Sequence, residues 1–211
     1  MIEKLAYSLG RNDEEPNIKL ALELIKTKNN NGINEIVDGI NNPIEQIGND
    51  CIKVLYEIGK REPVLISNYV EVFIKLLKSR NNRLVWGAMI ALSKIASITP
   101  QEIFDNLDTL IKAYEKGSVI TIDNSITVFA ELAKAGLKYE RIVFPIIIKH
   151  LETCRPKEVG QHSERAFVCV TKSNSELFKN TLLKRYDSLT EPQKKRIDKL
   201  LKKIEEGQFS T

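Results

Sequence analysis

The side chains best able to bind a metal ion are two histidines and three cysteines in a chain of 211 residues. His150, His162 and Cys154 form no recognised metal motif, and a zinc site needs three or four ligands that converge. We therefore expect no metal site and interpret the histidines as solvated or helix-end residues. Cys51, Cys154 and Cys169 include no Cys-x-x-Cys pair, and their odd number does not suit a disulfide framework, so we expect reduced, structural thiols.

Motifs of enzymatic catalysis are missing from the sequence. It contains no glycine-rich phosphate loop, no Gly-x-Ser-x-Gly elbow and no His-Glu-x-x-His pair. Carboxylates are numerous but scattered, and nothing sets a pair of them apart by burial, as acid–base catalysis requires. The sequence therefore predicts a protein without catalytic residues or a cofactor.

A regular spacing of lysines is the most informative feature for binding. Lys75, Lys112 and Lys149 follow one another in steps of 37 residues, and we call them the lysine ladder. If the step is a structural repeat, these lysines occupy equivalent places on successive elements. Such a ladder could hold an acidic peptide, a phosphate-bearing partner or a nucleic-acid backbone.

A second interpretation of the ladder is a solvated helix face. Glu71 and Asp108 each stand four residues before a ladder lysine, an arrangement that stabilises a helix without any ligand. Pro145 replaces the acid before Lys149, and Asp38 takes the lysine position one step earlier, so the ladder is short. Both interpretations stay open.

Positive charge gathers in the second half of the chain. Residues 1–105 hold 13 Lys and Arg against 14 Asp and Glu, whereas residues 106–211 hold 19 against 14. This excess suggests a patch for an anion or nucleic acid. An isoelectric point near 8.8 is modest for a dedicated nucleic-acid binder. The alternative interpretation is that these charges only keep the surface soluble. The candidate residues are Lys184, Arg185, Lys194, Lys195 and Arg196.

The elements that must position these residues follow from the same 37-residue step. Apolar residues recur at that step from the N-terminal unit onward, with a one-residue insertion before the last unit. Within each step they recur at three- and four-residue spacing, which is typical of amphipathic helices. The first helix of each unit is expected at 44–60, 83–97 and 119–135, and the second at 64–79, 100–116 and 139–153. Equivalent apolar sets are Leu55, Leu92 and Phe129; Ile58, Ile95 and Leu132; and Phe73, Leu110 and Ile147.

Helix-end signals agree with this division. Thr99 with Glu102, and Thr190 with Gln193, match the capping box, in which a hydroxyl and an acid or amide satisfy open backbone N–H groups. Gly117 stands where a left-handed helix stop is expected. The stretch 190–206 predicts a C-terminal cap helix with one apolar stripe.

Residues 83–96 read Arg-Leu-Val-Trp-Gly-Ala-Met-Ile-Ala-Leu-Ser-Lys-Ile-Ala. This pattern has a basic residue, then small residues, then Ala-Leu, and a small residue where the helix ends. Residues 49–59 carry the pattern again. In these residues the chain resembles the HEAT-repeat (armadillo-like) family over about 17–189. The resemblance implies an all-α, right-handed α–α superhelix whose second helices line a concave face. Helical solenoids of this kind include alkylpurine DNA glycosylases, but the few aromatic residues here disfavour that role.

These observations predict a single repeat domain over 1–211, with about five helix pairs. Its units are expected at 5–42, 43–79, 80–117, 118–154 and 155–189, followed by the cap helix 190–206. Trp86 takes the position of Asn49 and Asp123 in neighbouring units, so it is either a partly exposed anchor for a partner or packed across to the next repeat.

The predicted function is a non-catalytic scaffold that binds another protein or peptide through Lys75, Lys112, Lys149 and Trp86. Nucleic-acid binding by the basic C-terminal third is the alternative. The acidic N-terminal stretch and the lack of a long apolar run argue against a signal peptide and a membrane span, so we expect a soluble, cytoplasmic protein.

Overall fold

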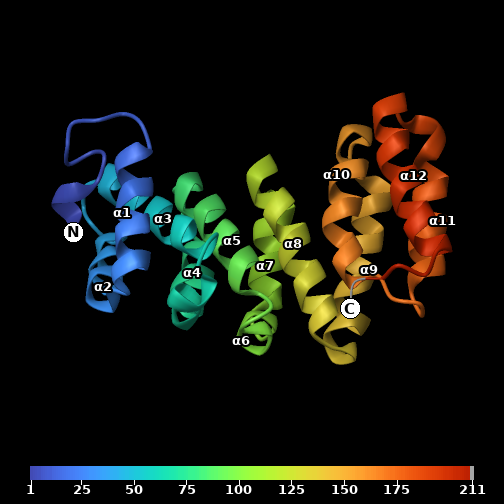
Figure 1. Cartoon of the computed structure of the whole chain (residues 1–211), viewed down its shortest axis with the longest axis horizontal. Helices are drawn as coiled ribbons and strands as arrows, with labels where there is room; N and C mark the ends of the chain where they lie inside the picture. Colours follow the sequence, from blue (N-terminus) through green and yellow to red (C-terminus); the bar gives the residue numbers. More distant parts are fainter. Residues whose placement is uncertain (210–211) are drawn as a thin grey trace. The chain divides into compact units, whose positions relative to one another are not determined.

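The described part of the chain, residues 1–209 of a computed structural model, contains helices and no β-strand. It divides into two compact units, Met1–Ser125 (unit 1) and Ile126–Thr211 (unit 2). Figure 1 shows the helices following one another as antiparallel pairs within each unit. The expected all-helical repeat fold is confirmed. The expectation of a single domain stays a prediction.

Unit 1 contains three helix pairs, in which the second member of two pairs is interrupted. Its elements are η1 Ile2–Lys4, α1 Glu15–Thr27, α2 Asn30–Gly39, α3 Glu45–Gly59, η2 Pro63–Tyr69, α4 Val70–Leu76, α5 Asn82–Ile95, α6 Pro100–Phe104 and α7 Leu107–Lys116. Helix α8, Val119–Ala135, runs across the boundary between the units.

Unit 2 contains most of the fourth pair, a fifth pair and the C-terminal helix. Its remaining elements are α9 Leu137–Thr153, α10 Pro156–Ala166, η3 Phe167–Cys169, α11 Ser175–Arg185, η4 Tyr186–Ser188 and α12 Glu191–Glu205. Helix α12 packs on α10 and α11 through Ile197 and Leu200, which are buried. The predicted cap helix is therefore present.

The 37-residue register is the register of the core. Leu55, Leu92 and Phe129 are fully buried, and the other two sets that define the step, which contain Ile58 and Phe73, are fully buried as well. Burial of one large apolar side chain stabilises the fold by about 1.5–3 kcal/mol, so this repeated stripe is the main source of stability. Helix α3 lies at the centre of unit 1, between α1 and α5.

Two of the three predicted second helices are interrupted, whereas the third, α9, is continuous as expected. In the second repeat, residues Pro63–Tyr69 form a 3-10 helix before α4. In the third repeat, the second helix is broken between α6 and α7. At that break, the Asn106 side-chain amide donates to the carbonyl of Glu102. Asn side chains compete in this way for backbone groups and end helices.

The helix-end signals are confirmed at one position and wrong at two. Thr190 and Gln193 form the predicted capping box. Thr99 does not cap α6, because its hydroxyl donates to the Ile95 carbonyl of the preceding helix. Gly117 has an extended backbone, not a left-handed one. A Cβ there would lie 2.5 Å from the Ala113 carbonyl oxygen, so close approach is what requires glycine.

None of the helices within residues 1–209 is both long and apolar enough to cross a membrane.

Candidate functional site

Two open hollows lie along the second helices of unit 1. They arise because the first helices α1, α3 and α5 pack directly on one another, while the space between the second helices is only partly filled. The α2–α4 hollow has a volume of about 520 Å³ and the α4–α7 hollow about 530 Å³. Volumes of this size are typical of sites that bind ligands in proteins.

The two hollows are equivalent places in successive repeats. Six residues of the first are related to six of the second by the 37-residue step. The α2–α4 hollow includes Ile40, Asn41, Val72, Lys75, Leu76 and Ser79. The α4–α7 hollow includes their counterparts Leu77, Lys78, Thr109, Lys112, Ala113 and Lys116. Each hollow thus has a ladder lysine beside a buried apolar residue, Leu76 or Ala113.

The lining of both hollows is basic. Lys75 and Lys78 line the first, and Lys78, Arg80, Lys112 and Lys116 line the second; no acidic residue lines either. Among residues 1–209, none of these five cations lies within 4.0 Å of a carboxylate. The acids that precede Lys75 and Lys112 by one turn therefore leave both lysines available to a partner.

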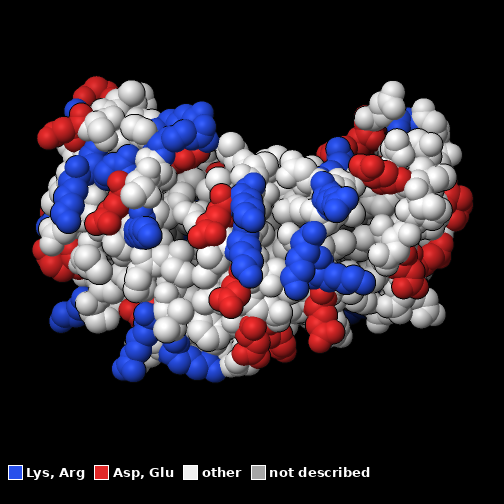
Figure 2. All heavy atoms as spheres, turned by 180° about the vertical axis from the view of Figure 1, so that it is seen from behind, with Lys and Arg blue, Asp and Glu red and all other residues white. Residues whose placement is uncertain are grey.

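On the face drawn in Figure 2, Lys and Arg side chains are interspersed with Asp and Glu side chains and with neutral surface. Charge recognition in the hollows therefore rests on the cations that line them, Lys75, Lys78, Arg80, Lys112 and Lys116.

The other two residues expected to bind a partner lie elsewhere. Lys149 is exposed on α9, in unit 2. Trp86, on the first helix α5, is half-buried: its ring packs against Tyr56 of the preceding repeat at 5.9 Å between centroids, and the Arg83 guanidinium lies over it at 5.5 Å. Trp86 lines neither hollow. Trp86 therefore packs against a neighbouring repeat, which is one of the two interpretations of its position. Its role as an anchor for a partner stays a prediction.

A buried charge cluster beside Trp86 was not predicted from the sequence. Glu57, with 5% of its side chain exposed, accepts hydrogen bonds from Lys53 at 3.0 Å, Lys60 at 2.7 Å and Arg61 at 2.6 Å. Burial raises the pKa of the Glu57 carboxyl, but the three cations lower it further, to about 2. Lys53 also pairs with Glu14 at 2.7 Å. The three- and four-residue spacings of acid and base in this stretch were the signal that could have revealed the cluster.

The basic residues of the C-terminal third are mostly engaged within unit 2. Arg185 donates to the backbone carbonyls of Leu151 and Cys154, at 2.6 and 2.7 Å. Arg196 pairs with Glu164. Lys194 pairs with Glu191 at 3.1 Å and Lys184 approaches Glu152 at 3.9 Å, while Lys195 is exposed. Less positive charge is available here than the sequence count implies.

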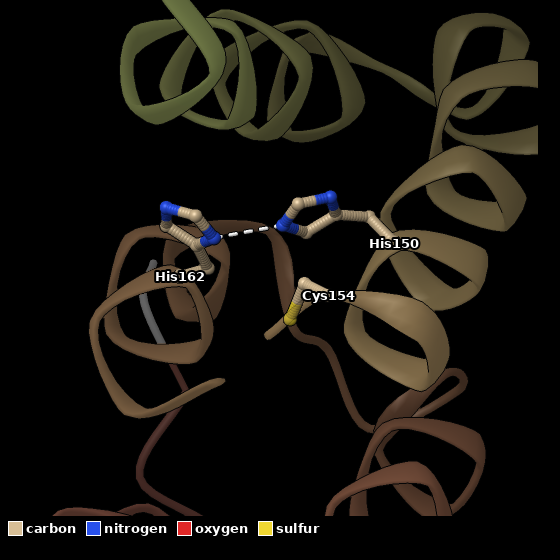
Figure 3. Close-up of side chains that lie close together, drawn as sticks. All are labelled: His150, Cys154 and His162. Carbon is tan, nitrogen blue, oxygen red and sulfur yellow. Dashed lines mark hydrogen bonds between the residues drawn. The ribbon is translucent and has the colours of Figure 1, made fainter. Parts of the chain in front are cut away.

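The two histidines are not solvated, which corrects that part of the prediction. His150 lies in the last turn of α9 and His162 in the middle of α10, and both are buried. His150 Nε2 and His162 Nδ1 share a hydrogen bond of 2.7 Å. Cys154, just beyond the end of α9, is half-buried beside them (Figure 3). Burial raises the pKa of the Cys154 thiol, and the nearby Arg185 guanidinium partly opposes that rise.

Comparison with known proteins identifies the fold. No family model matches the chain, and no curated protein matches it either. An engineered protein of known structure matches with a TM-score of 0.69 and 19% identity, over 99% of this chain and 98% of its own. The chain has an armadillo-like helical repeat fold.

Two designed proteins support this assignment. A designed armadillo repeat protein, solved in complex with the peptide (KR)4, matches with a TM-score of 0.66 and 17% identity, over 95% of this chain and 90% of its own. A computationally designed armadillo repeat protein for modular peptide recognition matches with a TM-score of 0.64 and 17% identity, over 89% and 91%. At these identities the likeness shows the fold alone.

Proposed function

We propose that this protein is a non-enzymatic scaffold whose unit 1 binds an extended acidic segment of another protein along α4 and α7. The observation that carries the proposal is the repeated basic hollow. Lys75 and Lys112 occupy equivalent places in it, beside apolar surface, and neither forms an ion pair with a carboxylate of residues 1–209. An acidic side chain can pair with each lysine while the intervening apolar residues fill the hollows.

The repeat spacing restricts the sequence of such a peptide. The first helices of successive repeats pack directly on one another, as packed helices do at about 8–10 Å, and a peptide in the polyproline II conformation advances about 3.1 Å per residue and points every third side chain in the same direction. About three peptide residues therefore span one repeat. The proposed ligand has an acidic residue at roughly every third position, with small or apolar residues between them.

The designed proteins with this fold include one whose ligand has the opposite charge to the proposed one. One of them is in complex with (KR)4, a basic peptide. The hollows described here are lined by lysine and arginine, so charge complementarity selects acidic partners. Trp86 in unit 1 and Lys149 in unit 2 are proposed as separate partner contacts outside the hollows.

A fluorescent 12-residue peptide of Glu-Leu-Ala repeats tests the proposal by anisotropy. The variant Lys75→Glu/Lys112→Glu should bind at least about tenfold more weakly. Each exposed ion pair contributes up to about 1 kcal/mol, and charge reversal adds repulsion. The matched control is Lys26→Glu/Lys134→Glu, which reverses two exposed lysines on the first helices α1 and α8 and should bind like the unmodified protein.

Equal loss of affinity in Lys75→Glu/Lys112→Glu and in Lys26→Glu/Lys134→Glu would show that binding follows net charge. That result would refute the assignment of the binding site to the hollows. Nucleic-acid binding is tested in parallel with single-stranded DNA and RNA at low salt. Binding that weakens steeply with salt and is lost in Lys184→Glu/Lys195→Glu, with no peptide binding, would favour the alternative over this proposal.

A further inference from the structure

Three side chains of unit 2 with the chemistry of metal ligands converge at the turn between α9 and α10. His150 comes from the last turn of α9, Cys154 from just beyond its end, and His162 from the middle of α10. One nitrogen of each imidazole and the Cys154 sulfur all lie within 4.8 Å of one another (Figure 3). No other group of three such residues is found within residues 1–209.

The two imidazoles already point ligand atoms at a common place. Nε2 of His150 faces Nδ1 of His162 at 2.7 Å, so one nitrogen donates the shared proton and the other accepts it. When the donor ring moves that proton to its other nitrogen, two lone pairs face each other. In tetrahedral zinc geometry the nitrogens stand about 3.3 Å apart and nitrogen and sulfur about 3.6 Å apart. From the present structure the two nitrogens must move apart from 2.7 Å, and the sulfur, which lies within 4.8 Å of them, must come to this distance.

Burial of both histidines has an energetic cost that exposed histidines do not have. His150 and His162 are 5% and 0% exposed, although burying polar rings is unfavourable unless their polar atoms are satisfied. They are the two histidines of the whole sequence, and the fold brings both to one place. Cys154 is half-buried, so the cluster has a side open to an incoming ion.

The ligand set selects the kind of ion. Imidazole and thiolate ligands suit zinc and similar borderline-soft ions, whereas calcium and magnesium require oxygen ligands. The nearby carboxylate of Glu158 is held by Arg155 and completes the capping box of α10, so it does not join the cluster. The protein therefore offers two nitrogens and one sulfur, which leaves a fourth position for water.

We propose that His150, Cys154 and His162 bind one Zn²⁺ ion, which ties the end of α9 to α10 and stabilises unit 2. On binding, the thiol releases one proton, and the donor imidazole transfers its proton to its other ring nitrogen. This site lies outside the hollows of unit 1 and does not depend on peptide binding.

Cobalt titration of the full chain, after chelation and removal of any bound metal, tests the proposal. Co²⁺ should bind with a stoichiometry of one and give intense visible bands of tetrahedral cobalt and a near-ultraviolet band of thiolate-to-cobalt charge transfer. Added Zn²⁺ should bleach these bands. Cys154→Ser should lose the charge-transfer band and bind at least about tenfold more weakly. The matched control is Cys169→Ser, a buried cysteine of unit 2 outside the cluster, which should behave as the unmodified protein.

His162→Gln should abolish the visible bands. If this buried His162→Gln substitution prevents folding, Cys154→Ser still decides the test. Zn²⁺ should also raise the thermal midpoint of the unmodified protein and of Cys169→Ser by the same amount, and that of Cys154→Ser by less. The proposal is overturned if the unmodified protein shows no cobalt bands, or if Cys154→Ser and Cys169→Ser show the same spectrum. The histidines would then be a buried hydrogen-bonded pair and nothing more.

Discussion

Replacing Glu57 with glutamine tests the buried charge cluster of α3. The carboxylate accepts from Lys53, Lys60 and Arg61 at 2.6–3.0 Å, and the Lys53 side chain is itself only 7% exposed. Glutamine keeps the size of the side chain and removes its charge. Lys53 then retains Glu14 as its ionic partner, and the amide cannot accept all three hydrogen bonds.

The magnitude follows from the pKa of the Glu57 carboxyl. Its value falls from the ordinary 4.5 to about 2 in the folded protein, and every tenfold change in an acid dissociation constant corresponds to about 1.4 kcal/mol. The ionised group therefore stabilises the fold by up to about 3 kcal/mol. Because the folded pKa is lowered, this stabilisation is fully present above pH 4.5 and is lost as the pH falls through about 2.

Urea unfolding followed by tryptophan fluorescence measures the effect directly. Trp86 is the sole tryptophan of the sequence and packs beside the cluster, on Tyr56, so it reports the unfolding of this region. At pH 7, Glu57→Gln should lower the free energy of unfolding by about 2–3 kcal/mol, and near pH 2 the difference from the unmodified protein should largely vanish. Glu71→Gln, an exposed acid on α4, is the control and should change little.

A free-energy difference that is the same at pH 7 and pH 2 would refute this reasoning, because it would show that the substitution acts through packing alone. A difference at pH 7 below about 0.5 kcal/mol would do so as well, since that is the range of ordinary surface substitutions.

Three further outcomes are expected. Gly87→Ala should destabilise the fold by about 1 kcal/mol in urea unfolding, because its Cβ would lie 2.7 Å from the buried Ile52 side chain. The cost of overpacking, about 1–3 kcal/mol, exceeds the gain in helix propensity. A stabilised variant would contradict the close packing of α5 on α3. Thr190→Ala should cost about 1 kcal/mol by loss of the capping box, measured by circular dichroism. Cys51 and Cys169 should resist alkylation at pH 8 until urea unfolds the protein, because burial raises the pKa of each thiol to about 12; mass spectrometry would show early modification if this is wrong.

The fold could be predicted because its information is periodic. Leu55, Leu92 and Phe129 are set 37 residues apart, and a helix pair can bury such a stripe only against its neighbours. Interruptions such as the one at Asn106 escaped prediction, since they depend on which carbonyl a short polar side chain reaches.

The candidate sites were only partly predictable. The step that places Lys75 and Lys112 in equivalent positions is visible in the sequence, but the hollows around them depend on how far apart the second helices lie. The meeting of His150 with His162 depends on the angle between α9 and α10, which no local pattern specifies. Spacing along one helix would have paired His150 with Cys154 and still missed His162.

A charge-swap experiment tests the central claim, binding of an acidic peptide in the hollows of unit 1, most directly. Anisotropy is measured for the Glu-Leu-Ala peptide and for a matching Lys-Leu-Ala peptide against the unmodified protein and Lys75→Glu/Lys112→Glu. We predict that the unmodified protein prefers the acidic peptide and that the double variant loses most of this preference, because its two ladder positions become acidic while Lys78, Arg80 and Lys116 still line the hollows. An unchanged preference in the double variant would contradict the claim.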